Sequence, residues 1–289
     1  MNGILLVDKP AGFTSHDVVA KLRGILRERR IGHSGTLDPM ATGLLVVFVG
    51  RATRAVEFAE NDGKEYIASM RLGVETDTQD MSGNVLRERD MSVTDGEITA
   101  ALKSLLGDSL QIPPMYSAIK IGGKKLYEIA RSGGEVERTP RRIKISEIEF
   151  MRREGAECSF RVFCSKGTYV RTICADAGEK LGCGAALSAL RRTKAGDFSV
   201  DNAFSLQQIS ALAAEGRAGE ALLPLNSLFT GYTGLVIDEG AERRCRCGTE
   251  FHCPSPDGIY TVYSSDGAFL MLGRCEAGVM KTVKSFFEV

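Results

Sequence analysis

A single carboxylate, that of Asp38, stands at the centre of a segment that runs from Gly32 to Gly43, contains three glycines and lacks helical or strand periodicity. Because Asp38 precedes Pro39, its backbone is held in extended geometry and its side chain should project from the chain. Glycines permit the tight turns that such a loop needs. A projecting carboxylate can act as a nucleophile, whereas in an ordinary surface turn it would only cap the local backbone. The segment alone leaves both interpretations open.

A second candidate feature is the basic segment at residues 115–145. It contains eight Lys and Arg side chains against three Glu, a balance of +5, together with Tyr116 and Tyr127. Cations neutralise phosphates and aromatic rings stack on unpaired bases, so this composition is typical of an RNA-contacting surface. A solvated charged face is an equal alternative. The whole chain has a formal net charge of zero, which gives no global argument for a nucleic-acid partner.

Regular apolar patterns on both sides of the Gly32–Gly43 segment predict the elements that hold it. A helix is predicted to begin at Thr14 or Ser15, to carry its apolar residues on one face and to end just before this segment. Continuous or partly alternating apolar runs predict buried strands. These strands cover residues 4–7, 44–49 and 64–72.

The middle of the chain continues this mixture of helix and strand. Thr94–Glu97 has the residue spacing of a capping box, which predicts a helix that runs to about Leu106. Alternating apolar residues predict two antiparallel strands around a turn at 152–155, and a helical stretch then ends near Leu181. The two strands cover residues 143–150 and 158–164, and another is predicted at 186–193. The pattern indicates an α+β fold around a mixed sheet.

After Pro224 the chain becomes a Gly-rich series of short predicted strands. They cover residues 235–237, 258–263, 269–273 and 279–287. Their size and spacing predict a small β-barrel appended to the larger domain. Four soft ligands occur within nine residues of this tail, but their spacing fits poorly to the paired cysteines of a structural zinc site, so no metal site is predicted. They are Cys245, Cys247, His252 and Cys253.

Composition and length indicate the class of protein and its location in the cell. The chain has 289 residues, of which 43% are hydrophobic and 26% are charged, and these values are typical of a soluble protein. No apolar run approaches the roughly 20 residues of a membrane-spanning helix. The N-terminus lacks the basic leader and long apolar core of a secretory signal, and eight scattered cysteines in a long chain are typical of free thiols. These features predict a cytoplasmic protein without a membrane contact.

Five motifs occur in an order and spacing that identify a known family. They are the segments 32–43, 64–66, 115–118, 165–171 and 190–193. From about Leu5 to about Leu225 the chain resembles bacterial tRNA pseudouridine synthase B, the TruB family. The resemblance implies a catalytic domain at 1–230, with a central mixed, mainly antiparallel sheet flanked by helices and an RNA-clamping insertion at about 113–142. It also implies a PUA-like, RNA-binding β-barrel domain at 231–289.

The function that this resemblance implies is isomerisation of uridine to pseudouridine at position 55 in the T loop of tRNA, without a cofactor or a metal. Asp38 matches the family's catalytic aspartate. Moving the base from an N1 to a C5 linkage breaks a glycosidic bond, and an ionised carboxylate can attack the sugar, attack the ring or abstract a sugar proton. An ordinary Asp has a pKa of roughly 3.9 and is ionised at neutral pH, so it needs positioning more than activation. The sequence does not choose between the three routes.

The resemblance also assigns roles around Asp38. Arg171 matches the arginine that pairs with the catalytic aspartate, and Tyr66 matches the tyrosine that stacks on the flipped uracil. Tyr169 and Leu190 match residues that line the base pocket. By residue type alone, an ordinary surface arginine is favoured for Arg171 and a core tyrosine for Tyr66. Tyr169 and Leu190 could equally be core residues.

Contacts with the rest of the RNA are expected outside the base pocket. His33 matches a residue that enters the RNA stack where the base has left, so it is assigned to RNA binding and not to general-base catalysis. Asp80 lies where the family contacts the substrate loop, although a turn cap is an equal alternative. The predicted phosphate contacts are Lys9, Arg54, Lys120, Lys124, Lys125, Arg141 and Arg142.

Two other functions remain open at this point. One is a non-catalytic tRNA-binding or folding module on the same scaffold, and the other is the related guide-RNA-dependent synthase, which needs protein partners. Asp38, Tyr66 and Arg171 favour the stand-alone enzyme, because a binding module has no need for a carboxylate that faces a phosphate-rich ligand. The expected partner is the T arm of tRNA, and a monomer with no obligate protein partner is expected.

Overall fold

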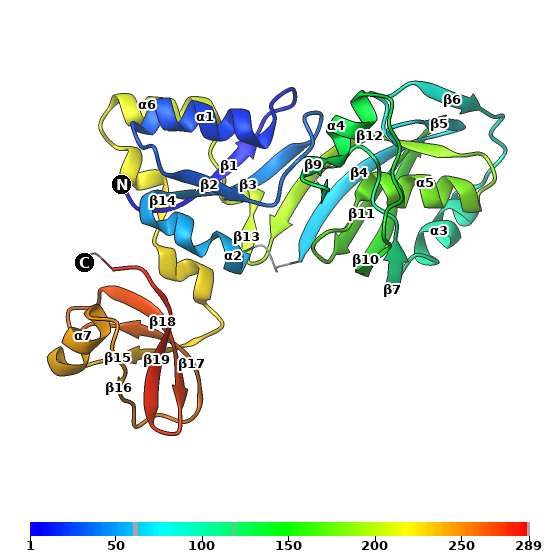
Figure 1. Cartoon of the computed structure of the whole chain (residues 1–289). Helices are drawn as coiled ribbons and strands as arrows, with labels where there is room; N and C mark the ends of the chain where they lie inside the picture. The colour runs from blue at the N-terminus through cyan, green and yellow to red at the C-terminus, as the bar shows by residue number, and fades with distance from the viewer. Residues whose placement is uncertain (60–62, 118, 288–289) are drawn as a thin grey trace.

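The computed structural model describes residues 1–59, 63–117 and 119–287. Within these residues, the larger part is built on a ten-stranded sheet and the C-terminal part on a five-stranded sheet (Figure 1). The strands of the large sheet are β1 (Gly3–Lys9), β2 (Ile31–Ser34), β3 (Thr42–Val49), β4 (Lys64–Leu72), β7 (Gly107–Gln111), β10 (Arg141–Glu154), β11 (Glu157–Cys164), β12 (Ala185–Ala195), β13 (Phe198–Ser199) and β14 (Leu222–Leu223). Two small hairpins add β5 (Val74–Thr76) with β6 (Val85–Glu88), and β8 (Lys120–Ile121) with β9 (Lys124–Lys125).

Helices cover the large sheet and connect its strands. The α-helices are α1 (Ser15–Leu26), α2 (Val56–Ala59), α3 (Asp95–Lys103), α4 (Leu126–Arg131), α5 (Val170–Lys180) and α6 (Leu206–Ala214). The 3-10 helices are η1 (Gly50–Ala55), η2 (Val200–Asn202), η3 (Ala218–Ala221) and η4 (Leu225–Phe229). None of the helices in the described part of the chain has the length and apolar character to cross a membrane.

The strand order of the large sheet joins two halves at one parallel pair. The order is β14-β1-β3-β12-β4-β11-β10-β7, with β2 paired to β3 and β13 to β12. The pairs are antiparallel except that of β12 with β3, where Arg191 lies opposite Thr42 and Arg192 lies opposite Gly43. The sheet is therefore mixed and mainly antiparallel, as the sequence predicted. Because Gly43 ends the segment that carries Asp38, this junction lies next to the candidate catalytic loop.

The half of the sheet that contains β1 and β3 is buried on both faces. Leu5 and Val7 pack with α1 and α6, whereas Ile4 and Leu6 pack with η1 and α2 on the opposite face. Figure 1 shows α1 and α6 lying together along one side of these strands. A strand that is buried on both faces needs a continuous apolar sequence, and this explains the unbroken run at 44–49.

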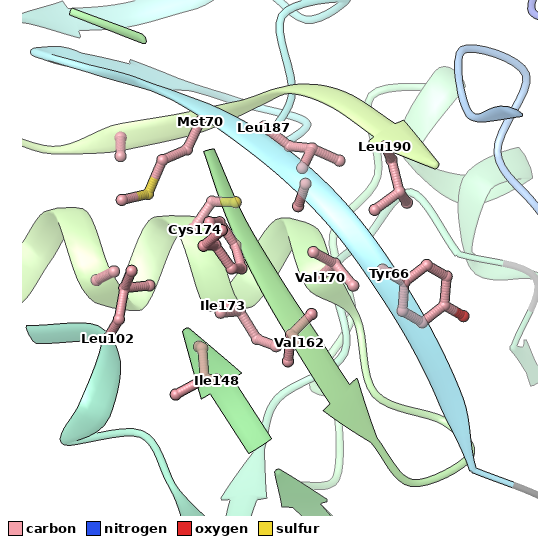
Figure 2. Close-up of a cluster of buried hydrophobic side chains, with 14 of the residues drawn as sticks. Tyr66, Met70, Leu102, Ile148, Val162, Val170, Ile173, Cys174, Leu187 and Leu190 are labelled. Carbon is pink, nitrogen blue, oxygen red and sulfur yellow. The ribbon is translucent and has the colours of Figure 1, made fainter. Parts of the chain in front are cut away.

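The other half of the sheet forms the largest hydrophobic core with α3 and α5. Figure 2 shows this core, with Met70 of β4 and Val162 of β11 facing Ile173 and Cys174 of α5. Tyr66 and Leu190 belong to the same buried cluster. Leu37 and Ala41 of the Asp38 loop also pack into it, so the core fixes the position of the loop.

The C-terminal part is a curled sheet with the strand order β15-β17-β18-β19-β16, consistent with the PUA-like fold that the sequence predicted. Its elements are β15 (Thr233–Val236), α7 (Glu239–Arg246), β16 (Phe251–His252), β17 (Gly258–Tyr263), β18 (Phe269–Glu276) and β19 (Val279–Ser285). The ring of Phe229 lies 5.7 Å from that of Phe269 and 5.8 Å from that of Phe286. Lys284 pairs with Glu57 at 2.7 Å. The two sheets are therefore joined by a packed aromatic cluster and an ion pair.

Several predicted boundaries are wrong although the elements exist. The Gly32–Gly43 segment was expected to be irregular throughout, but residues 32–34 belong to β2 and β3 begins at Thr42. Pairing with β3 satisfies the backbone groups of β2, and a four-residue strand of mixed polarity leaves no periodic pattern. The turn predicted at 152–155 lies at 155–156, and α3 ends at Lys103 instead of Leu106. Helices α6 and α7 were not predicted.

Candidate active site

The loop between β2 and β3 presents the carboxylate of Asp38 at the surface of the core. The backbone N–H of Leu37 donates to Oγ of Ser15 at 2.9 Å, and the N–H of Ala41 donates to the carbonyl of Asp38 at 3.1 Å. Leu37 and Ala41 are buried on either side of Asp38. The Asp38 side chain keeps 36% of its exposure, so a rigidly held loop offers it to a ligand.

Arg171, in the first turn of α5, holds this carboxylate through two bonds. Nε lies 2.9 Å from Oδ2 of Asp38, and Nη2 donates to Oδ1 at 3.3 Å. Nη1 donates to the carbonyl of Thr78 at 3.2 Å, and Nη2 also donates to the carbonyl of Tyr116 at 2.9 Å. The Arg171 side chain is only 5% exposed. One buried guanidinium thus ties the Asp38 loop to two other segments and fixes the orientation of the carboxylate.

The surroundings of Asp38 act on its pKa in opposite directions. Burial disfavours the charged form and raises the pKa above its ordinary value, and the charge of Asp80 adds to this effect. The Arg171 guanidinium and, more weakly, Lys9 favour the carboxylate and oppose the rise. The environment of Asp38 therefore perturbs its pKa, and a perturbed pKa is a common property of catalytic carboxyls.

One hollow of about 690 Å³ opens beside Asp38 and contains all four residues assigned to the base pocket. Tyr66 and Leu190 form its buried wall, and Figure 2 shows both at one end of the hydrophobic core. Tyr169 is fixed by Gln111, which accepts from the Tyr169 N–H at 2.8 Å and donates to its carbonyl at 3.1 Å. Burial raises the pKa of Tyr66, so its phenol is neutral at physiological pH. An aromatic and aliphatic pocket of this kind suits a planar base.

A second hollow of about 720 Å³ lies on the other side of Asp38. Tyr116, Tyr127, Lys125 and Arg131 of the basic segment line it. The Lys125 ammonium and the Arg131 guanidinium lie 5.3 and 5.5 Å from the centre of the Tyr127 ring. The interleaved cations and rings that the sequence indicated are therefore assembled on one wall, next to the carboxylate.

His33 lies at the boundary between the two hollows. It lines both of them, and its Nδ1 is buried without a hydrogen-bond partner among the described residues. Burial and the nearby Arg192 lower the pKa of His33, so its imidazole is neutral at pH 7. The position agrees with the predicted contact with RNA, and that role stays a prediction.

Two protein-family models match this chain. A model of the TruB family pseudouridylate synthase N-terminal domain matches residues 23–170, and a model of the tRNA pseudouridylate synthase B C-terminal domain matches residues 171–230. The chain belongs to the TruB family. It is 42% identical to tRNA pseudouridine synthase B of Clostridium tetani, over 98% of this chain and 99% of that one. It is 47% identical to tRNA pseudouridine synthase B of Alkaliphilus oremlandii, over 78% and 75%. The enzyme is accordingly a pseudouridine synthase, an isomerase.

Solved structures share the fold of this TruB-family chain over nearly its whole length. A crystal structure of a Cbf5-Nop10-Gar1 complex contains a chain that is 26% identical, with a TM-score of 0.75 over 99% of this chain and 85% of that chain. An H/ACA RNP bound to a substrate RNA contains one that is 24% identical, with a TM-score of 0.76 over the same shares. At 24% identity, the likeness to the H/ACA RNP chain shows the fold alone.

The structure of this TruB-family chain corrects the prediction for Lys9. Its side chain is fully buried, and its Nζ donates to the carbonyls of Pro10, Phe13 and Pro39 at 3.0, 2.6 and 3.3 Å. Burial lowers the pKa of Lys9 from 10.5 to about 8. A lysine in this position cannot reach a phosphate. It ties the end of β1 to the Asp38 loop instead, and its sequence context next to Pro10 gave no sign of burial.

Asp80 takes the turn-capping role that the sequence left open. Its Oδ1 accepts hydrogen bonds from the Thr78 hydroxyl and the Ser82 N–H at 2.8 and 3.0 Å. The side chain is 7% exposed and lies 3.8 Å from Nε of Arg171. Asp80 also lines the second hollow, so a substrate contact stays a prediction.

The predicted phosphate contacts divide into two groups. Lys120, Arg141 and Arg142 line the base-pocket hollow, and Lys125 lines the other. Lys124 and Arg54 are exposed but line neither hollow. Their contact with RNA is a weaker prediction than that of the first four.

Arg192 was not predicted as a site residue, although it supports the Asp38 loop from within the sheet. It is 1% exposed, its Nε donates to the carbonyl of Leu44 at 2.7 Å, and its Nη2 donates to that of Gly35 at 2.9 Å. Gly43 is required beside it, because a Cβ at Gly43 would lie 2.3 Å from the Arg192 carbonyl oxygen. The available signal was an arginine inside an apolar strand pattern, which needs partners when it is buried.

No group of three or more His, Cys, Asp or Glu side chains within the described residues is arranged to hold a metal ion.

Proposed function

We propose that this TruB-family enzyme isomerises uridine to pseudouridine at position 55 in the T loop of tRNA, with Asp38 as the catalytic carboxylate. The observation that carries the proposal is the buried Arg171 side chain bonded to the carboxylate of Asp38 at the junction of two hollows. The tRNA substrate is further supported by the names of the relatives from Clostridium tetani and Alkaliphilus oremlandii.

The target base must leave its stack before a carboxylate on the protein can reach it. The hollow that contains Tyr66 and Leu190 accepts the flipped uracil, and Tyr169 closes its side. His33 takes the place of the base in the RNA stack. Lys120, Arg141 and Lys125 contact phosphates around the entrance, as their positions on the hollow walls allow.

The reaction balances without an external reagent. The bond between N1 and the sugar carbon C1′ breaks, a bond between C5 and C1′ forms, the hydrogen on C5 leaves and N1 gains a proton. Asp38 acts on the sugar or on the ring while Arg171 favours its ionised form and aligns it. The neutral phenol of Tyr66 can stack on the base and take part in proton transfer. We propose that no cofactor or metal takes part.

Two other functions fit the same fold. A non-catalytic tRNA-binding module would keep the basic walls but would not need a bidentate ion pair at Asp38. A guide-RNA-dependent synthase would need additional components, and the Cbf5-Nop10-Gar1 complex is an assembly of several proteins. We propose instead a cytoplasmic enzyme that acts alone as a monomer on free tRNA.

One experiment separates the three functions. Purified chain is mixed with tRNA transcribed with tritium at uracil C5, in monovalent salt with EDTA. The expected result is release of about one equivalent of tritium per tRNA, since one C5 hydrogen is lost for each isomerised uridine. A control transcript with cytidine at position 55 should release none. Binding without release would contradict the proposed activity, and release from the control transcript would contradict the single target.

A further inference from the structure

A buried hydroxyl in the basic segment has no partner within the described part of the chain. Ser117 is 5% exposed, and its Oγ makes no hydrogen bond with any described residue. Leaving such a group unsatisfied costs its desolvation, so unpaired buried hydroxyls are uncommon in folded proteins. The hydroxyl therefore indicates a partner outside the described residues.

The position of Ser117 indicates where that partner lies. Ser117 lines both the base-pocket hollow and the hollow of Tyr116 and Tyr127. Asp38 and Arg171 also line both. The hydroxyl thus belongs to the junction of the two hollows, and a ligand that reaches Asp38 from either side comes close to it.

The backbone around Ser117 is held in place. Its N–H donates to the carbonyl of Met115 at 2.9 Å, and its carbonyl accepts from the N–H of Tyr127 at 3.1 Å. The preceding carbonyl, that of Tyr116, accepts from Arg171 at 2.9 Å. Ser117 is therefore fixed relative to the ion pair of Asp38, and its hydroxyl is preorganised for binding.

The part of the ligand that occupies the junction follows from the chemistry at Asp38. Under the proposed function, the uracil fills the hollow of Tyr66 and Leu190, and Asp38 acts close to the bond between base and sugar. The group at the junction is then the sugar of the target nucleotide. Resting on that function, we propose that Oγ of Ser117 hydrogen-bonds the ribose-phosphate of the target uridine and holds its sugar against Asp38.

The first test replaces the hydroxyl and measures activity and stability together. Ser117→Ala should lower kcat/KM for tritium release by about 2- to 12-fold, the value of one net hydrogen bond. Its melting temperature should stay equal or rise, because the substitution removes no hydrogen bond among the described residues. Unchanged kcat/KM, or a lowered melting temperature, would overturn the proposal.

Two control variants separate hydrogen bonding from packing. Ser117→Cys keeps nearly the same volume but bonds weakly, so it should lose as much activity as Ser117→Ala. Recovery of wild-type activity by Ser117→Cys would show a packing role and would overturn the proposal. Ser109→Ala, at an exposed position of β7 that lines neither hollow, should match wild type.

The second test identifies the bonded part of the nucleotide. Filter binding compares intact tRNA with tRNA that carries an abasic ribose at position 55. Ser117→Ala should weaken binding of both RNAs by the same factor, and a loss seen only with the intact base would overturn the assignment to the ribose-phosphate. If wild-type protein releases tritium and Ser117→Ala equals it in both tests, only the Ser117 proposal fails; if wild type releases none, the proposed function fails.

Discussion

Replacing Arg171 with lysine should slow isomerisation by about 100-fold or more although the positive charge is kept. The guanidinium reaches Asp38 at 2.9 and 3.3 Å and the carbonyls of Thr78 and Tyr116 at 3.2 and 2.9 Å. A lysine has one nitrogen and cannot span these acceptors. Loss of one charge-assisted hydrogen bond costs about 1.5–3 kcal/mol, or roughly 10- to 150-fold in rate, and a 1 Å displacement of Asp38 can cost about another 100-fold.

Arg171→Gln adds a pH test, because it removes the charge that opposes the raised pKa of Asp38. Without that charge the pKa of Asp38 rises further. The reaction needs the carboxylate, so the acid limb of the pH–rate profile should move to higher pH in Arg171→Gln than in Arg171→Lys.

The assay is single-turnover tritium release with saturating enzyme, with tRNA binding measured in parallel on filters. Arg217→Lys is the matched control, since Arg217 forms exposed ion pairs with Glu215 and Glu220. A rate for Arg171→Lys within about threefold of wild type, or an acid limb that moves to lower pH in Arg171→Gln, would refute the role given to the ion pair.

Three further predictions concern the pocket, the basic walls and the loop support. Tyr66→Leu should reduce the rate of single-turnover tritium release by about 5- to 150-fold, because stacking on a base is worth roughly 1–3 kcal/mol. Tyr66→Phe is the control that keeps the aromatic ring. An unchanged rate in Tyr66→Leu would show that Tyr66 is only a core residue. Neutralising the basic residues on the hollow walls should reduce the log–log salt dependence of filter binding by roughly 0.7–0.9 for each lost phosphate contact. Neutralising Lys124 and Arg54 together should reduce it less per residue, and an equal reduction per residue would contradict this division. The wall residues are Lys120, Lys125, Arg141 and Arg142. Lys9→Met should destabilise the fold by about 1–3 kcal/mol through unsatisfied carbonyls. Because the folded pKa of Lys9, about 8, is below 10.5, the unfolded chain binds more protons than the folded chain between these pH values. The difference in the free energy of unfolding between wild type and Lys9→Met should therefore grow as pH rises through this window. If urea titrations at pH 8 and pH 10 give the same difference, the burial of Lys9 is refuted.

The sequence predicted the features of the fold that depend on local pattern. The continuous apolar run at 44–49 predicted a strand buried on both faces, and Thr94 predicted the start of α3, because both signals lie within a few residues. Strand β2 was missed because it is stabilised by pairing with β3, a contact that periodicity does not contain. Helix α7 was missed because it is highly charged and buries Cys245 alone among its residues.

In the candidate site, the motifs predicted which residues come together but not which of them are buried. The family resemblance placed Asp38, Arg171, Tyr66 and Leu190 together, and the structure assembles them around one hollow. Burial was not visible in the sequence. Lys9 was expected at the surface and is inside, since its partners are carbonyls contributed by residues up to 30 positions away.

The most direct test of the central claim is single-turnover tritium release by Asp38→Asn. Asparagine keeps the volume of Asp38 and can still accept a hydrogen bond from Arg171, but it lacks the charge that the chemistry needs. Wild-type protein should release about one equivalent of tritium per tRNA, whereas Asp38→Asn should release none while its tRNA affinity stays within about tenfold of wild type. A rate for Asp38→Asn above about a tenth of wild type would contradict the assignment of Asp38 as the catalytic carboxylate.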